Sequence, residues 1–239
     1  MLALGIDTSS DAGSVGLVSL GGPGGDDGLL GELNLRSGRT HSRRLLPSIH
    51  SLLETAGRKP RDLDLLAVAV GPGSFTGLRI GMATAKGLSL ALDRPLLGFS
   101  TLETIAKAVA SLLPVQPRVP PRPICVLLDA GRGEVYRGLF ESAGDDVTPV
   151  LPEIAIGPGR AMEGIPDACV ICGSGVKLLD GIELSGPGER LILPGSTPFL
   201  GATLAYRALA MARTMPAGPF PAMTPNYLRL SDAEMTLKG

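Results

Sequence analysis

The chain is poor in the residue types that build nucleic-acid surfaces and disulfide frameworks. Aromatic side chains make up 3% of its 239 residues, tryptophan is absent, and the formal net charge is −1. Because a single-stranded nucleic-acid surface needs basic grooves and aromatic stacking platforms, we expect any nucleic-acid role to run through a partner. The three cysteines, Cys125, Cys169 and Cys172, are too few for a disulfide framework and fit a reducing cytoplasm.

Membrane and export signals are also missing. No apolar run approaches the roughly 20 residues that span a bilayer. The first ten residues, "MLALGIDTSS", carry no positive side chain and include Asp7, which is unlike a secretory signal peptide. The sequence therefore predicts a cytoplasmic protein without a membrane segment.

Metal-binding patterns are scarce as well. The two histidines, His41 and His50, lie nine residues apart in a predicted helix, which places them on opposite sides of it. Cys169 and Cys172 form a C-x-x-C within "DACVICGSG", a β-like segment in which an odd separation directs two side chains to opposite faces. We therefore predict no metal site and interpret the cysteine pair as small buried thiols.

The apolar pattern indicates two α/β lobes. "LALGIDTSSDAGSVGLVSL" is typical of a hairpin whose turn carries Asp7, and "ICVLLDAGRGEVYRGLFE" repeats that order with Asp129 in the same place. Five prolines within residues 114–123 favour a linker. We predict an N-terminal lobe over 1–113, a linker over 114–123, and a C-terminal lobe with an extended tail over 124–239.

Two predicted helices of the first lobe carry distinctive stripes. Leucine and isoleucine recur at helical spacing over 42–56, which suits a hydrophobic core and a partner helix equally well. Small residues recur every four positions over 77–91, so another helix can approach closely there. The second helix follows a glycine-rich loop, "GPGSFTGLRIG", which lacks the lysine of a phosphate-binding Walker loop and the spacing of a dinucleotide fingerprint.

Several long segments resemble one bacterial family. They are "GIDTSSDAGSVGLV", "HSRRLLPSIHSLL", "AVAVGPGSFTGLRIGMATAKGLSLALDRPLLGFSTLETIA", "DAGRGEVYRGLF" and "PNYLR". Their order and spacing are similar to those of the TsaB family, also called YeaZ, although Gly131 stands where that family more often has arginine. The resemblance implies an α/β fold of two tandem ribonuclease-H-like (actin/Hsp70-like ATPase) lobes, each with a mixed sheet and flanking helices.

The resemblance also implies a function in tRNA modification. TsaB proteins are non-catalytic subunits that bind and activate TsaD, a metal-bearing transferase, in threonylcarbamoyl transfer to the tRNA adenosine beside the anticodon. The small ATPase TsaE joins this heterodimer, and tRNA is contacted only through the complex. On this interpretation the chain is not an enzyme by itself and requires no cofactor, while ATP or ADP and magnesium belong to the interface of the complex. Whether the isolated chain is a monomer or a homodimer stays open.

Two other functions stay open on the sequence alone. One is a nucleotide-binding phosphotransferase or ATPase of the same fold, with Asp7 and Asp129 flanking the nucleotide. The other is an M22-type, glycoprotease-like metallopeptidase, a label that such sequences have carried.

The candidate site residues form two groups, with no catalytic residue and no metal ligand among them. The predicted partner interface consists of Leu45, Leu46, Ile49, Leu53, Ile80, Ala83 and Gly87. The candidate nucleotide or anion contacts are Asp7, Thr8, Ser9, Ser74, Thr76 and Arg79. Which side chains of the two helices face TsaD and which face the core is not fixed by the sequence.

Overall fold

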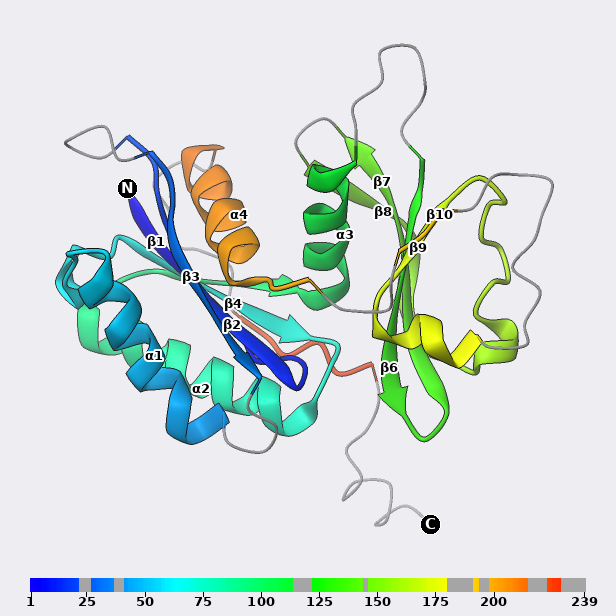
Figure 1. Cartoon of the computed structure of the whole chain (residues 1–239), viewed down its shortest axis with the longest axis horizontal. Coiled ribbons are helices and arrows are strands. Elements are labelled where there is room, and N and C mark those ends of the chain that lie inside the picture. Colours follow the sequence, from blue (N-terminus) through cyan, green and yellow to red (C-terminus); the bar gives the residue numbers. More distant parts are fainter. Residues whose placement is uncertain are drawn as a thin grey trace. The chain divides into compact units, whose positions relative to one another are not determined.

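The computed structural model describes residues 1–21, 27–36, 41–113, 122–143, 146–179, 191–193, 198–214 and 223–228. It divides the chain into two compact units (Figure 1). Unit 1 comprises Met1–Thr101 with Phe199–Asn226, and unit 2 comprises Leu102–Pro198 with Tyr227–Gly239.

Unit 1 is built on a five-stranded mixed sheet in the order β3-β2-β1-β4-β5. The strands are β1 (Leu2–Asp7), β2 (Ala12–Ser19), β3 (Gly28–Arg36), β4 (Leu65–Gly71) and β5 (Leu96–Ser100). The first three pair antiparallel, whereas β4 runs parallel to β1 and β5 runs parallel to β4. Every residue of β1 and β4 is buried, as expected of central strands covered on both faces.

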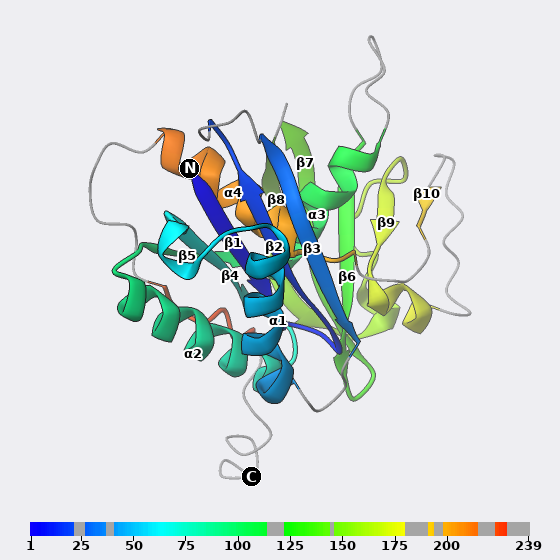
Figure 2. The same ribbon diagram turned by 60° about the vertical axis from the view of Figure 1, so that its left-hand side comes forward.

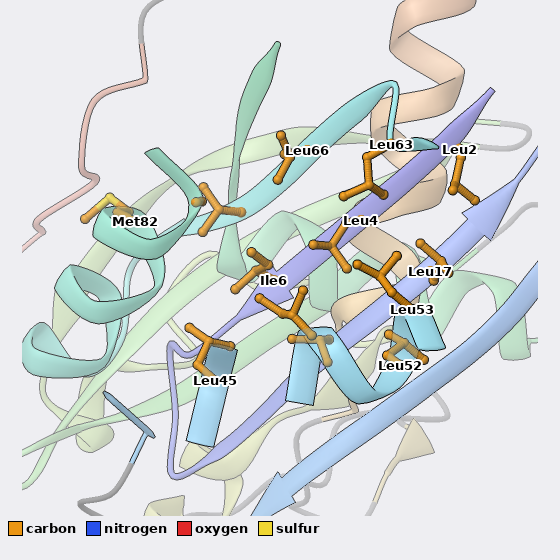
Figure 3. Close-up of a cluster of buried hydrophobic side chains, with 14 of the residues drawn as sticks. Leu2, Leu4, Ile6, Leu17, Leu45, Leu52, Leu53, Leu63, Leu66 and Met82 are labelled. Carbon is orange, nitrogen blue, oxygen red and sulfur yellow. The ribbon is translucent and has the colours of Figure 1, made fainter. Parts of the chain in front are cut away.

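Helices cover both faces of this sheet (Figure 2). On one face lie α1 (His41–Thr55) and α2 (Phe75–Leu92), with the short 3₁₀ helix η2 (Pro60–Asp62) between α1 and β4. Their leucines meet the apolar side of β1 and β2 in the main core (Figure 3). Figure 3 shows Leu45, Leu52 and Leu53 of α1 directed toward Leu4 and Leu17 of the strands.

The other face of the sheet is covered by α4 (Gly201–Thr214). A Cβ atom added at Gly5 or Gly16 would overlap the backbone of α4, so these glycines allow the helix to lie directly on the sheet. The Oγ atom of Ser14 accepts hydrogen bonds from the backbone N–H groups of Leu200 (3.0 Å) and Gly201 (2.8 Å). A side chain of β2 therefore caps the first turn of a helix far away in the sequence.

Unit 2 has a second five-stranded sheet, in the order β10-β9-β6-β7-β8. Its strands are β6 (Ile124–Gly131), β7 (Glu134–Ala143), β8 (Asp146–Ile156), β9 (Val170–Cys172) and β10 (Leu191–Ile192). Its helical elements are α3 (Thr101–Leu112) and the 3₁₀ helices η3 (Pro158–Arg160) and η4 (Ser174–Leu179). As in unit 1, an antiparallel hairpin, β6–β7, is extended by a strand parallel to its first member, β9.

The predicted fold class is confirmed, since each unit holds a mixed sheet with helical elements packed on it. The division of the chain differs from the predicted lobes at two helices. α3 precedes the predicted linker but belongs to unit 2, and α4 follows it but belongs to unit 1. Most of the predicted linker, 114–121, lies outside the described residues. Within the described part of the chain, no helix has the length and apolar character needed to cross a membrane.

All three cysteines are buried in unit 2, as predicted for Cys169 and Cys172. Desolvation raises the pKa of the Cys172 thiol well above its ordinary value, and neighbouring Cys125 raises it further. Because the thiolate is the reactive form, we expect a thiol reagent at pH 8 to label the native chain about a hundredfold more slowly than the chain unfolded in guanidinium. Mass spectrometry of timed samples checks this, and rapid native labelling of any cysteine would contradict the buried assignment.

Candidate functional site

The turn between β1 and β2 packs against the first turns of α2. The hydroxyl of Thr8 donates a hydrogen bond to the backbone carbonyl of Gly77 (2.7 Å), and the backbone N–H of Ser74 donates to the carbonyl of Ser9 (2.7 Å). Within the turn, the backbone N–H of Ser9 donates to the carboxylate of Asp7 (2.9 Å). All three turn residues are at most 3% exposed, so the helix closes over them.

Glycines at the start of α2 make this contact geometrically feasible. A Cβ atom at Gly73 would overlap the carbonyl oxygen of Ser9, one at Gly77 the carbonyl oxygen of Thr8, and one at Gly81 the hydroxyl of Thr8. The glycine-rich loop therefore brings a helix onto a hairpin turn at backbone contact distance. Ser74 caps the helix, because its Oγ atom accepts a hydrogen bond from the backbone N–H of Gly77 (3.3 Å).

The structure brings four of the six candidate anion contacts together and separates the other two. Asp7, Thr8, Ser9 and Ser74 meet at the turn described above. Thr76 and Arg79 are exposed on the outer side of α2, where the guanidinium of Arg79 lies 3.8 Å from the centre of the Phe75 ring. That stacking engages Arg79 with its own helix rather than with the turn.

The corresponding turn of unit 2 repeats the arrangement. The backbone N–H of Gly131 donates to the carboxylate of Asp129 (2.8 Å), as Ser9 does to Asp7. The other carboxylate oxygen of Asp129 pairs with the ammonium of Lys177 (2.9 Å), which belongs to η4. Partial burial alone raises the pKa of Asp129, but the Lys177 ammonium and the Gly131 N–H together hold that pKa below its ordinary value. Both predicted hairpins thus share one local geometry.

Neither turn fits a nucleotide phosphate as it stands. A phosphate cradle presents unengaged N–H and hydroxyl donors, whereas the hydroxyl of Thr8 and the backbone N–H of Ser9 already bond within unit 1. The Ser9 hydroxyl has no hydrogen-bond partner in the described part of the chain, but it is buried, and the residue Ser9 is only 3% exposed. In unit 2, Lys177 neutralises the aspartate that would face a metal. No group of three or more metal-ligating side chains occurs among the described residues.

The seven predicted interface residues divide by burial. Leu45, Ile49 and Leu53 are at most 4% exposed and belong to the core of unit 1. In unit 1 these three side chains therefore take the core alternative, because the same 3.6-residue spacing that makes a helix stripe directs them onto the sheet. Leu46, by contrast, is 53% exposed on α1.

The remaining residues lie on the outward side of α2. Ile80 is half-buried, while Ala83 and Gly87 are exposed, and a Cβ atom at Gly87 would meet no heavy atom within 4 Å. Leu90, which the sequence argument missed, is 84% exposed on the same side. Leu90 stands seven residues after Ala83 and three after Gly87, and this helical spacing is the sequence signal that places it on the same side of α2. We call Leu46, Ile80, Ala83, Gly87 and Leu90 the outer face.

The outer face consists of apolar residues, with an alanine and a glycine at its centre. The exposed side chains of Arg79 and Lys86 on α2 border it. α1 and α2 are in contact with one another, so both helices contribute to this side of unit 1. A surface of this kind suits the close approach of another helix, because small residues allow backbones to come near and leucines bury apolar area.

A family model and several known proteins are similar in sequence to this chain. The family model described as TsaD, tRNA N6-adenosine threonylcarbamoyltransferase, matches residues 35–234. The tRNA threonylcarbamoyladenosine biosynthesis protein TsaB of Bacillus subtilis is 29% identical over 255 residues, covering 98% of this chain and 96% of the relative. The protein of that name from Escherichia coli is 36% identical over 57% of this chain and 53% of its own length.

A solved structure resembles the whole fold. A Pseudomonas aeruginosa protein with similarity to peptidase YeaZ superposes with a TM-score of 0.77 at 26% sequence identity. The superposition covers 95% of this chain and 99% of that protein.

Proposed function

Because the chain belongs to the TsaB (YeaZ) family of tRNA threonylcarbamoyladenosine biosynthesis proteins, we propose that it is a scaffold subunit that binds and activates TsaD. The outer face is the observation that carries this proposal. It is a largely exposed set of apolar residues on two helices that are in contact, although Ile80 also packs against the core of unit 1.

The chemistry of the outer face supports a helical partner. Burial of apolar surface contributes about 25 cal/mol per Å², so two leucines and an isoleucine supply a useful part of an association energy. Since the TsaD family model matches this chain, TsaD and the chain share sequence features of one fold. Two helices of TsaD equivalent to α1 and α2 then pack on the outer face to form a four-helix contact between related subunits.

The engaged turns support a scaffold rather than a catalytic subunit. The Thr8 hydroxyl and the Ser9 N–H in unit 1, and the Gly131 N–H and the Lys177 ammonium in unit 2, are bonded within their own units, which favours placing the reaction on the partner. TsaE joins the pair, tRNA is reached only through the complex, and ATP or ADP with magnesium binds at the interface of the complex. The assembly works in the cytoplasm, and the outer face also accounts for a homodimer when TsaD is absent.

Reconstitution tests this function. We expect the purified chain to co-elute with TsaD and TsaE, and the formation of threonylcarbamoyladenosine on tRNA to require all three proteins. Product is quantified by mass spectrometry of tRNA nucleosides, with one protein omitted from each control reaction. Full modification without this chain, or hydrolysis of ATP by the chain alone, would contradict the scaffold role.

A further inference from the structure

Unit 1 contains a pocket of about 340 Å³ at the edge of its sheet opposite the 7–9 turn. The pocket lies where β1 begins and β2 ends, beside the segments that lead into β4 and β5. The N label in Figure 2 marks the start of β1 at this edge. Three arginines, Arg58, Arg61 and Arg94, line it together with Asp62 and Asp64.

The two carboxylates of the pocket are held by the backbone. Asp64 accepts a hydrogen bond from the backbone N–H of Leu2 (2.8 Å), and Asp62 accepts one from that of Lys59 (2.7 Å). Neither Arg61 nor Arg94 forms an ion pair within the described part of the chain. Three guanidinium groups and two carboxylates thus line the cavity, so the balance of these side-chain charges is positive.

Arg94 supplies the second observation. Its Nε atom is buried without a hydrogen-bond partner in the described residues, and its Nη2 atom makes only a long contact, 3.4 Å, with the carbonyl oxygen of Arg61. A buried guanidinium donor without an acceptor is unusual, because leaving it unsatisfied costs more than a hydrogen bond contributes. The Nη2 atom carries a second N–H, so Arg94, which lines the pocket, keeps donor capacity for an anion there.

We propose that this pocket binds the phosphate group of a ligand. The planar guanidinium fork matches phosphate oxygens in bidentate fashion, and the volume lies at the small end of ligand sites. Nucleotide sites in open α/β sheets lie at the carboxyl ends of the strands, whereas this pocket lies at the amino ends of β1, β4 and β5. It is therefore separate from the 7–9 turn, and the proposal does not depend on TsaD binding.

Calorimetric titration of the full chain with pyrophosphate tests the proposal. We expect pyrophosphate to bind the parent chain, and Arg61→Gln and Arg94→Gln each to weaken that binding about tenfold. The matched control is Arg213→Gln, which removes the same charge from an exposed position of α4 in the same unit and should leave the affinity unchanged. Ionic strength is held constant so that general screening is equal in all titrations.

A second titration identifies the source of the phosphate. A short single-stranded RNA is titrated into the parent chain and the same three variants. If RNA binding is weakened in the two pocket variants but not in the control variant, the site is assigned to an RNA backbone. Weakening of pyrophosphate binding without an effect on RNA would assign it to a small phosphate compound. Because the Arg61 side chain makes no hydrogen bond or ion pair in the described part, its variant should keep the parent fold, with circular dichroism as the check. Absence of binding by the parent to both probes, or equal weakening by Arg213→Gln, overturns the proposal.

Discussion

Gly77→Ala is expected to destabilise the chain by about 3 kcal/mol, because a methyl group there has no space. The added carbon would overlap the backbone carbonyl oxygen of Thr8. Thr8 lies in the hairpin turn and is only 1% exposed. The turn cannot simply move away. Thr8 bonds to the carbonyl of Gly77, and Ser9 bonds to the backbone of Ser74, so α2 and the turn are fixed to each other at both ends of the contact.

Gly87→Ala is the matched control, since it makes the same change ten residues later in the same helix. A Cβ atom at Gly87 meets no heavy atom within 4 Å, so only the backbone entropy of glycine is affected. We expect this variant to be stabilised by about 0.5–1 kcal/mol. Urea unfolding followed by circular dichroism measures both changes, and a similar sign and size for the two variants would show that the turn does not pack on α2 as described.

These two glycines also show which features of α2 can be predicted from the sequence and which cannot. The loop "GPGSFTGLRIG" predicts a sharp turn from a strand into a helix, and the structure has β4 and α2 there. The sequence could not tell that Gly77 faces the hairpin turn while Gly87 faces outward, because the contact of Gly77 lies 69 residues away at Thr8. Helical spacing alone assigns small residues to rows but does not identify their neighbours.

Periodicity has the same limit in α1. The spacing of its leucines predicts an amphipathic helix, which is confirmed, but Leu45 is buried and its neighbour Leu46 is 53% exposed. The apolar side of a helix packs on an available apolar surface. For α1 that surface is formed by β1 and β2, which come earlier in the chain. The same reasoning explains α3 and α4, whose membership of a unit depends on tertiary contacts rather than on sequence order.

Ala83→Glu is expected to weaken the association of the chain with TsaD by at least about 100-fold. Ala83 is exposed at the centre of the outer face, so a carboxylate there is solvated in the free chain and buried without a partner in the complex. Removing an unpaired charge from water costs about 3 kcal/mol or more, which corresponds to that loss of affinity. Pull-down with tagged TsaD, followed by calorimetry, measures the change.

The control for this variant is Ala210→Glu, which introduces the same charge at an exposed position of α4 in the same unit. It should bind TsaD as the parent does, and both variants should keep the parent's unfolding midpoint. If Ala83→Glu also binds with parental affinity, the outer face is not the interface.

Gly87→Ala adds a sharper criterion, because a methyl group that stabilises the free helix obstructs a closely packed partner. Greater stability of the free chain combined with weaker TsaD binding would locate the closest helix contact at Gly87, since a purely structural role of that glycine predicts no loss of affinity.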